Sequence, residues 1–365
     1  MIQLQVKIDP LPIEAPLVVR LRVQSSDSKL GYGEGEASLI ARDETMAEFD
    51  VAGFSLRVYT TQIDDLDGDV VLVMPGARSM HRLIRKASNH NTFLITEQCD
   101  QKCIMCSQPP KKYHKDLFDQ FFEAVRLAPK NITIGLSGGE PFLHKDRLFN
   151  FLLKAQEERP DLNFHILTNA QHFSPTDKAI LQRLDQSSLL WGIPIYSACA
   201  KTHDRIVEKS GAFKTLQENL ALLGSVGACV ELRTVLLKSN VDSLENLAAY
   251  ILAHFPFAQV WAIMQLENIG YARMNWQREF FDSSILFEDL ALGIDLAIAK
   301  GLNTSLYNFP LCTVPEIYRT FCVASISDWK QKFLEPCLDC TAKQACSGFF
   351  EWYPEESGFK EVRSL

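Results

Sequence analysis

From Phe93 onward, short apolar runs alternate with longer segments of helical periodicity, which is the pattern of repeated βα units. The strands are predicted at residues 93–96, 132–136, 163–168, 189–196, 230–237 and 259–266. The helices are predicted at residues 114–127, 145–158, 175–186, 213–226, 242–255 and 284–300. Such units form either an open parallel sheet or an incomplete barrel, and both architectures place chemistry at the carboxyl ends of the strands.

The first 88 residues have a different pattern, with short apolar runs at 17–23, 54–59 and 70–74 separated by Gly, Asp and Pro. This pattern predicts a small β-rich domain. We therefore expect three parts in the chain: a β-rich domain at 1–88, a barrel at 89–300 and a C-terminal region at 301–365.

Two segments of the N-terminal domain are predicted to be turns. Gly31, Gly33 and Gly35 lack the spacing of a phosphate-binding loop, so we expect a flexible turn there. The acidic run at 64–69 lacks the spaced ligands of a calcium loop, so we expect a solvated turn.

The charge and hydropathy patterns exclude two classes of partner. A formal net charge of −8 argues against a large nucleic-acid footprint, because such binding neutralises phosphates with Lys and Arg. No apolar run approaches the roughly 20 residues that span a bilayer, and the N-terminus lacks the pattern of a signal peptide. We therefore expect no membrane partner and a cytoplasmic location.

The ten cysteines are unevenly distributed, and three of them follow the first predicted barrel strand as Cys99-x3-Cys103-x2-Cys106. In a reducing compartment, clustered thiols hold metal or do redox chemistry more often than they form disulfides. Three thiolates this close can bind one soft metal centre. A structural zinc site needs a fourth ligand, whereas an iron–sulfur cluster with three protein ligands keeps one iron open to a cofactor or substrate.

The sequence Ser137-Gly138-Gly139-Glu140 ends the second predicted strand. Its two glycines let the backbone approach a ligand closely, and its carboxylate and amides suit an amino-acid moiety. An ordinary strand-to-helix turn is the alternative for this motif alone. Because it follows the cysteine loop by one βα unit, both motifs are expected at adjacent strand ends.

With these two motifs, the chain resembles the radical S-adenosylmethionine (SAM) superfamily. The resemblance implies a TIM-like partial (β/α)6 barrel in which Cys99, Cys103 and Cys106 hold a [4Fe-4S] cluster whose open iron is chelated by SAM. It implies that the strand end at Gly138-Gly139-Glu140 holds the methionyl amino group. The implied activity is reductive cleavage of SAM to a 5′-deoxyadenosyl radical.

Further polar residues at the predicted strands extend this resemblance. Thr168 and Asn169 follow the third strand, and Asn169 is a candidate cofactor contact. Ser197 is a candidate ribose contact, and Arg233 is a candidate for the carboxylate or ribose. Polar residues that only cap layers of the barrel are the alternative for Ser197 and Arg233.

A second group of cysteines, near the C-terminus, can supply a complete ligand set for an auxiliary cluster. Its members are Cys312, Cys337, Cys340 and Cys346. A closed zinc site would use the same ligands, but the resembling family often carries an auxiliary cluster here, which favours a second [4Fe-4S] cluster. Cys322 is equally well a buried free thiol.

Three other residues are predicted to have no chemical role. Cys199 and Cys229 are expected to be inert structural thiols, and His165 is expected to be a satisfied core residue or a member of a barrel layer rather than a base.

The closest resemblance is narrower and rests on the segments FLITEQCDQKCIMCSQPPK, NFPLC at 308–312, SISDWK at 325–330 and the ending CLDC…CSGFF. These are similar to the radical SAM maturases of the His-Xaa-Ser repeat system, the HxsC type. This resemblance implies radical modification of a ribosomally made peptide with His-Xaa-Ser repeats. A second radical SAM maturase, a small companion protein and an electron donor such as flavodoxin or ferredoxin are implied partners.

Alternatives remain open at this point. The chain could be a non-catalytic iron–sulfur or zinc protein that acts as a redox sensor or scaffold. It could also be a radical SAM enzyme that acts on a small molecule in nucleoside or cofactor biosynthesis. The N-terminal domain could bind a leader segment by adding a strand to an exposed sheet edge, or be purely structural.

Overall fold

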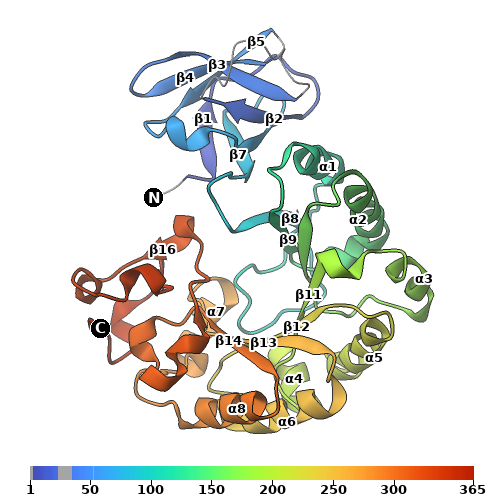
Figure 1. Cartoon of the computed structure of the whole chain (residues 1–365), viewed down its shortest axis with the longest axis vertical. Helices are drawn as coiled ribbons and strands as arrows, with labels where there is room; N and C mark the ends of the chain where they lie inside the picture. Colours follow the sequence, from blue (N-terminus) through green and yellow to red (C-terminus); the bar gives the residue numbers. More distant parts are fainter. Residues whose placement is uncertain (1–2, 24–34, 52) are drawn as a thin grey trace. The chain divides into compact units, whose positions relative to one another are not determined.

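The computed structural model describes residues 3–23, 35–51 and 53–365 (Figure 1). The turn predicted at Gly31 and Gly33 lies outside the described residues, whereas Gly35 is described and has a positive φ of 82°. Within the described part of the chain, no helix is both long and apolar enough to cross a membrane.

Seven strands at the N-terminus close into a small β-barrel, drawn in blue in Figure 1. They run in the order β1-β5-β4-β3-β2-β6-β7, and β7 pairs back with β1. Alternate side chains along these strands are buried in one apolar core, as expected for a barrel wall. The strands are β1 (Gln5–Ile8), β2 (Leu17–Arg22), β3 (Glu36–Arg42), β4 (Met46–Val51), β5 (Phe54–Tyr59), β6 (Val70–Val73) and β7 (Ser79–Ile84).

This closure bears on the hypothesis that a leader segment adds a strand to a sheet edge. A closed barrel has no free edge, because each described strand already pairs on both sides. The β-rich character predicted for this region is confirmed, but the exposed edge that strand addition needs is absent from the described barrel strands.

The acidic run at 64–69 differs from the predicted solvated turn at its last residue. Asp64 begins a short 3-10 helix, Asp64–Leu66, but Asp69 is only 1% exposed. The Asp69 carboxylate lies 2.5 Å from Nε of Arg82, which is also buried. The charged partner of Asp69 is Arg82, which lies thirteen residues further along the chain on β7. A local sequence pattern does not reveal this pairing.

Eight strands form a second sheet, whose order follows the sequence from β8 to β15. The pairs from β11 to β15 are all parallel. The six predicted strands are confirmed to within two residues at each end. The strands are β8 (Asn91–Thr96), β9 (Thr133–Gly138), β10 (Asn163–Leu167), β11 (Leu189–Pro194), β12 (Val230–Val235), β13 (Ala258–Met264), β14 (Asn303–Tyr307) and β15 (Cys322–Val323).

The last two strands correct the predicted six-stranded barrel. β14 and β15 continue the parallel sheet into the region predicted as a separate C-terminal part. The sequence of β14, NTSLY, is largely polar, and β15 has only two residues, so neither forms an apolar run. The parallel α/β architecture is confirmed, with two strands more than predicted.

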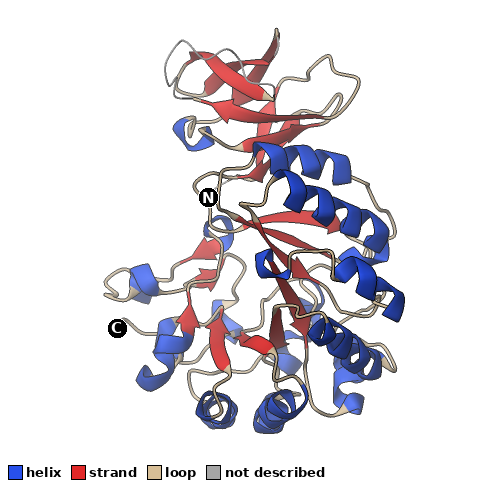
Figure 2. Cartoon of the chain, turned by 45° about the vertical axis from the view of Figure 1, so that its right-hand side comes forward, coloured by secondary structure: helices blue, strands red, loops and turns tan. Residues whose placement is uncertain are grey.

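Helices alternate with these strands, and Figure 2 shows strands and helices by type. They are α1 (Phe118–Leu127), α2 (Lys145–Glu158), α3 (Lys178–Leu181), α4 (Ala200–Val207), α5 (Ala212–Ser225), α6 (Leu244–His254), α7 (Gly270–Glu279) and α8 (Glu288–Ala299). The helix predicted at 114–127 starts only at Phe118, whose backbone N–H donates to the Asp116 carboxylate at 3.1 Å.

Two short helices, α4 and α7, were not predicted. α7 has the sequence GYARMNWQRE, in which Ala272, Trp276 and Glu279 are the buried residues. A buried set that includes a glutamate and an alanine gives no clear apolar stripe, so the periodicity of the sequence does not reveal the helix.

Packing divides the chain into two compact units. The first comprises Met1–Ile95, Lys115–Leu136 and Asp146–Phe164, and the second comprises Thr96–His114, Ser137–Lys145 and His165–Leu365. Every residue predicted to bind metal or cofactor belongs to the second unit. The predicted domain limits at 88 and 300 stay predictions.

The second unit has an apolar core that joins the cysteine loop to the C-terminal region. Ile104 and Met105 pack in one cluster with Phe349 and Tyr353. The C-terminal region is otherwise built of short 3-10 helices and the two-stranded sheet of β16 (Gln331–Lys332) and β17 (Phe349–Phe350).

Candidate active site

Cys99, Cys103 and Cys106 lie on an irregular loop that follows β8. Burial raises the pKa of the Cys99 thiol to about 11, and Cys106 adds to this effect. Burial also raises the pKa of Cys103, and both neighbouring thiols contribute. The three thiols are therefore close enough to influence one another.

The thiols are neighbours without converging on one point. Cys99 Sγ accepts from the backbone N–H of Gln101 at 3.4 Å, and Cys106 Sγ donates to the Gln108 carbonyl at 3.0 Å. Among the described residues, no three His, Cys, Asp or Glu side chains gather closely enough to hold a metal ion. The ligand roles of these cysteines stay predictions.

The two unpredicted helices hold the cysteine loop in place. The N–H of Ile104 donates to the carbonyl of Ile206 on α4 at 2.9 Å. The side-chain amide of Asn275 on α7 donates to the Ile104 carbonyl at 2.8 Å, and the N–H of Tyr271 donates to the Cys106 carbonyl at 2.8 Å. The loop has no regular structure of its own, so these contacts satisfy its backbone groups.

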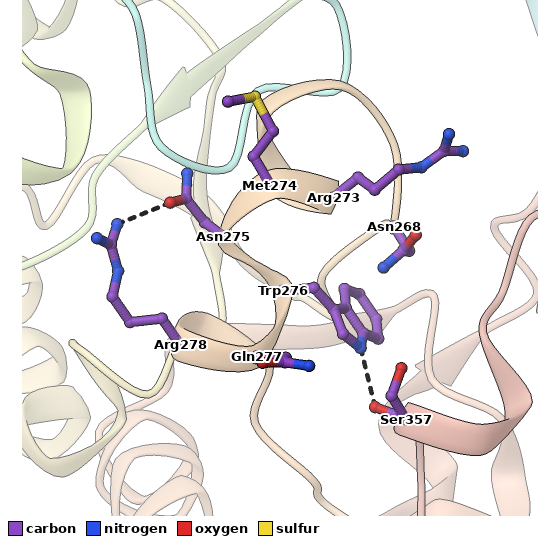
Figure 3. A pocket seen from close by; sticks show the side chains of 8 residues that line it. All are labelled: Asn268, Arg273, Met274, Asn275, Trp276, Gln277, Arg278 and Ser357. Carbon is purple, nitrogen blue, oxygen red and sulfur yellow. Dashed lines mark hydrogen bonds between the residues drawn. The ribbon is translucent and has the colours of Figure 1, made fainter.

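Residues of α7 also border an open pocket of about 470 Å³ (Figure 3). Two of its contacts are drawn there: Trp276 Nε1 donates to the Ser357 carbonyl at 2.9 Å, and Arg278 donates to Asn275 Oδ1 at 2.9 Å. The pocket is lined by Asn268, Arg273, Met274, Asn275, Trp276, Gln277, Arg278 and Ser357. None of the residues predicted to bind a cofactor or metal lines it.

The glycines at the end of β9 bring this strand against the cysteine loop. Gly138 has a φ of 149°, and a Cβ there would overlap the carbonyl oxygen of Thr96. A Cβ on Gly139 would lie 3.1 Å from Cβ of Cys99. The N–H of Gly139 donates to the Thr96 carbonyl at 2.7 Å, and the N–H of Glu140 donates to the Gln98 carbonyl at 2.7 Å. Close approach of the two motifs therefore requires glycine at both positions.

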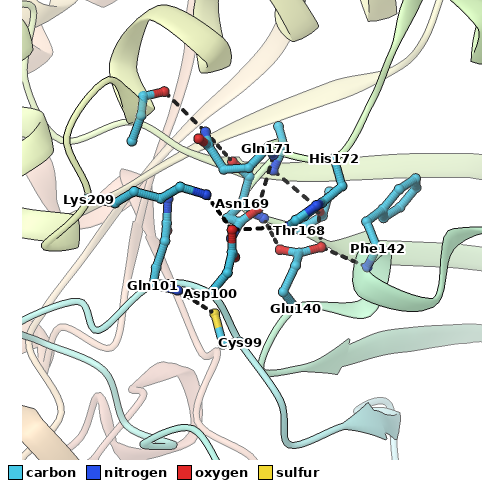
Figure 4. Close-up of polar contacts among 12 residues, drawn as sticks. Cys99, Asp100, Gln101, Glu140, Phe142, Thr168, Asn169, Gln171, His172 and Lys209 are labelled. Carbon is cyan, nitrogen blue, oxygen red and sulfur yellow. Dashed lines mark hydrogen bonds and ion pairs between the residues drawn. The ribbon is translucent and has the colours of Figure 1, made fainter.

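The carboxylate of Glu140 is fully buried and already engaged (Figure 4). It accepts from the N–H of Phe142 at 2.8 Å, from Thr168 Oγ1 at 2.6 Å and from the N–H of Asn169 at 2.6 Å. Burial raises the pKa of Glu140 to about 7, although the three hydrogen bonds oppose this shift. In this arrangement Glu140 ties the end of β9 to the end of β10, and its predicted contact to an amino group stays a prediction.

Asp100, which follows the first cysteine, was not singled out from the sequence. Its carboxylate lies 3.1 Å from Nε2 of His172, pairs with Nζ of Lys209 and accepts from Nδ2 of Asn169 at 3.0 Å. Burial opposes ionisation, but the contacts from His172, Lys209 and Asn169 outweigh it and hold the pKa of Asp100 below its ordinary value. The sequence feature that could have identified Asp100 is the presence of an acidic residue inside the cysteine motif.

Two other predicted cofactor contacts have partners within the chain. Ser197 is 2% exposed, and its Oγ accepts from the N–H of Cys199 at 3.1 Å. Arg233 pairs with Glu231, donates to Sδ of Met264 at 3.2 Å and lies over the ring of Tyr307. The roles proposed for Ser197 and Arg233 toward a cofactor are neither supported nor opposed by these contacts.

Arg233 belongs to a polar cluster formed by β10, β12 and β14. Glu231 lies 3.4 Å from Nε2 of His165 and accepts from the hydroxyl of Tyr307 at 3.2 Å. Burial opposes ionisation of Glu231, but its contacts with His165 and Arg233 lower its pKa to about 2. A Cβ on Gly192 of the intervening β11 would lie 2.8 Å from Nε2 of His165, so this glycine makes room for the cluster.

The C-terminal cysteines line a small cavity together. Cys312, Cys337, Cys340 and Cys346 all border it, in the company of Lys343 and Arg363. Sγ of Cys346 accepts from the N–H groups of Leu311 and Gly348, both at 3.3 Å. Burial raises the pKa of Cys312, and Cys346 and Cys337 add to the shift.

The remaining cysteines differ from one another. Cys322 is absent from the lining of that cavity, and burial raises its pKa to about 12. Cys199 was predicted to be an inert structural thiol, but it is exposed, and backbone hydrogen bonds of Thr202 and Lys201 at the start of α4 lower its pKa. The expectation that Cys199 is inert stays a prediction. Cys229 is half-buried, and its sulfur accepts from Nε2 of Gln259 at 3.1 Å.

Comparison with known proteins gives one family match. Residues 93–251 match the family described as the Radical SAM superfamily. The match covers less than half of the chain. No curated protein matches the chain.

Several solved structures are similar to part of the chain. The chain is 16% identical to Streptococcus suis SuiB bound to S-adenosylmethionine, with a TM-score of 0.49 over 59% of this chain and 49% of SuiB. SuiB bound to its precursor peptide SuiA gives the same identity and TM-score, over 59% and 48% of the two chains. A domain of pyruvate-formate lyase-activating enzyme from Bacteroides vulgatus is 12% identical, with a TM-score of 0.38 over 49% of this chain and 99% of that domain. The chain spans about half the length of SuiB.

Proposed function

We propose that this protein is a radical SAM enzyme. The observation that carries the proposal is the contact between its two motifs, in which Glu140 N–H donates to the Gln98 carbonyl beside Cys99. The family match over residues 93–251 covers both motifs. Radical SAM chemistry needs three thiols for the cluster and a strand end that binds the amino-acid part of SAM. Here both candidates lie at one edge of a parallel sheet.

The residues present fit the cofactors that the superfamily implies. Cys99, Cys103 and Cys106 offer three thiols on one short loop, which is the number of protein ligands that leaves one iron of a [4Fe-4S] cluster open. When bound, the cluster and SAM supply a 5′-deoxyadenosyl radical that abstracts hydrogen from the substrate.

The remaining proposed contacts to SAM lie at or near the strand ends of the same unit. They are Ser137, Gly138, Gly139, Glu140, Asn169, Ser197 and Arg233. The glycines let β9 approach the cysteine loop closely, while Glu140 and Asn169 fix the ends of β9 and β10 relative to each other. Of these residues, Glu140 and Ser197 are buried. A site that excludes water and other hydrogen donors is what a reactive carbon radical requires.

We further propose that the C-terminal cavity holds a second [4Fe-4S] cluster on Cys312, Cys337, Cys340 and Cys346. Four cysteines bordering one cavity support this assignment, and Cys322 is left out because it does not border it. The N–H groups that approach Sγ of Cys346 would stabilise a thiolate there. Zinc on the same four ligands is the outcome that metal analysis must exclude.

The proposed substrate is a ribosomally made peptide, and this proposal rests on the sequence resemblance to maturases of the His-Xaa-Ser system. The proposed partners are a peptide with His-Xaa-Ser repeats, a second radical SAM maturase, a small companion protein and a flavodoxin or ferredoxin as electron donor. The proposed location is the cytoplasm, where a low-potential donor is available.

Formation of 5′-deoxyadenosine tests the proposed function. The protein would be reconstituted anaerobically with iron and sulfide and incubated with SAM and dithionite, and the nucleoside measured by mass spectrometry. Wild type and a Cys229→Ala control should form it, whereas Cys103→Ala should not. A reconstituted wild type that holds its cluster but forms no 5′-deoxyadenosine would instead favour the redox sensor or scaffold.

A further inference from the structure

Asp100 occupies an unusual place for a carboxylate, directly after Cys99 on the cysteine loop. A negative charge beside three thiols disfavours thiolates there, so electrostatic activation of the cysteines does not explain this residue. Its contacts point to a different role, because its partners lie far along the chain and belong to other segments.

Two segments converge on the Asp100 carboxylate (Figure 4). Asn169 and His172 come from the segment that follows β10, and Lys209 comes from the connection between α4 and α5. Asn169 Nδ2 donates to Oδ1 at 3.0 Å, while Nε2 of His172 and Nζ of Lys209 contact Oδ2. The loop is thereby attached to two separate parts of its own unit.

These contacts are shielded more than an ordinary surface ion pair. The side chains of Asp100, His172 and Lys209 are 24%, 26% and 33% exposed, respectively. Surface pairs contribute little because water screens them and both side chains lose freedom. A carboxylate that accepts hydrogen bonds from Asn169 and Lys209 and lies beside the His172 ring is held in one position more firmly, since charge-assisted hydrogen bonds act together.

Asn169 links this arrangement to the Glu140 strand end. Its backbone N–H donates to Oε2 of Glu140 at 2.6 Å, and its side chain donates to Asp100. A continuous set of hydrogen bonds thus runs from Glu140 through Asn169 to Asp100, next to Cys99. Through Asn169, the position of the cysteine loop is tied to the position of the proposed SAM-binding edge.

We propose that Asp100 is a positioning residue that fastens the cysteine loop to the end of β10 and to the α4–α5 connection. The functional meaning of this clamp rests on the proposed radical SAM function, because the loop it fixes is the one that would hold the cluster. Asp100 acts through the loop, and no contact to cofactor or substrate is assigned to it.

Amide hydrogen exchange of the full-length protein as isolated, without added cluster or SAM, tests the clamp directly. In Asp100→Asn we expect peptides that cover residues 97–108 to exchange about tenfold faster than in wild type, because local opening becomes easier. In Lys209→Gln we expect an increase of about threefold, since one of the two hydrogen-bond donors to Asp100 is lost. Lys209→Gln leaves the loop sequence unchanged, so it also tests the clamp if Asp100→Asn does not fold.

Asp119→Asn is the matched control, because Asp119 forms an exposed ion pair with Arg147 on another part of the chain. It should leave exchange at 97–108 unchanged. The proposal is overturned if the loop of both clamp variants exchanges at the wild-type rate, or if the control accelerates it equally. This readout involves no SAM chemistry, so its failure is distinct from a failure to form 5′-deoxyadenosine.

A spectroscopic readout separates positioning from a general loss of structure. In the Cys337→Ala/Cys340→Ala background, which should hold the loop cluster alone, the paramagnetic signal after anaerobic reconstitution and reduction should broaden in Asp100→Asn, because a loosened loop holds its thiols in several arrangements. Asp100→Glu, which keeps the carboxylate, should restore a signal of wild-type width. Equal line widths in wild type and Asp100→Asn would contradict the positioning role.

Discussion

Thr168 Oγ1 donates a hydrogen bond to the Glu140 carboxylate at 2.6 Å, so the ends of β10 and β9 are joined by a buried side-chain contact. Replacing Thr168 with Val keeps the side-chain shape but removes this donor from a buried carboxylate. We expect the free energy of unfolding to fall by about 1–3 kcal/mol. Urea unfolding measures the change. Thr176→Val is the control, because its hydroxyl contact with Ser174 is exposed, and an equal loss there would contradict the account.

The pH dependence of stability should carry a contribution from Glu140. Its pKa is about 7 in the folded chain, against an ordinary 4.5, so the folded state binds the proton more tightly than the unfolded state. The stabilisation is fully present below pH 4.5 and is lost as the pH rises through about 7. Between pH 5 and pH 8, wild type should lose roughly 2–3 kcal/mol more stability than Glu140→Gln. If the free energy of unfolding changes equally with pH in the two proteins, the raised pKa assigned to Glu140 is refuted.

The Arg233 guanidinium neutralises Glu231, which is 3% exposed in its side chain. Arg233→Met should cost about 3 kcal/mol of unfolding free energy, because removing one partner leaves a buried charge uncompensated. The control is Arg42→Met, whose pair with Asp64 joins two side chains that are 50% and 74% exposed. It should cost less than about 1 kcal/mol by the same denaturation measurement. Similar losses for the two variants would show that the buried pair contributes little.

The number of clusters per chain distinguishes the two assignments of the C-terminal cysteines. After reconstitution, wild type should contain about eight iron and eight sulfide per chain, and Cys337→Ala/Cys340→Ala about four of each. Both are measured by metal and sulfide analysis. If the cavity holds zinc, wild type will instead contain about four iron and one zinc, and only the zinc will be lost from the variant.

Much of the fold was predictable because its strands are apolar runs with regular connections. All six predicted strands are confirmed, since buried parallel strands are apolar on both faces. β14 was missed because Asn303, Thr304 and Ser305 are polar, although each pairs in register with β13. The pattern of a single strand does not show that a neighbour will pair with it.

The site was predictable where chemistry and backbone geometry depend on local sequence. Gly138 and Gly139 were predicted to let the backbone approach a ligand, and in the structure both face backbone atoms of the cysteine loop at distances that exclude a side chain. Their approach to a ligand stays a prediction. The Asp100 clamp and the loop-holding α7 were missed, because their partners are separated by many residues and become neighbours only through the fold. Asp69 and Arg82 were missed for the same reason.

The central claim is that a cluster on Cys99, Cys103 and Cys106 binds SAM at the Glu140 strand end. Electron paramagnetic resonance of the reduced Cys337→Ala/Cys340→Ala protein tests it most directly, because this variant should hold one cluster only. Adding SAM should shift the g-values of the signal, and adding adenosine should not. A signal that SAM leaves unchanged, in protein with intact iron and sulfide content, would contradict the claim.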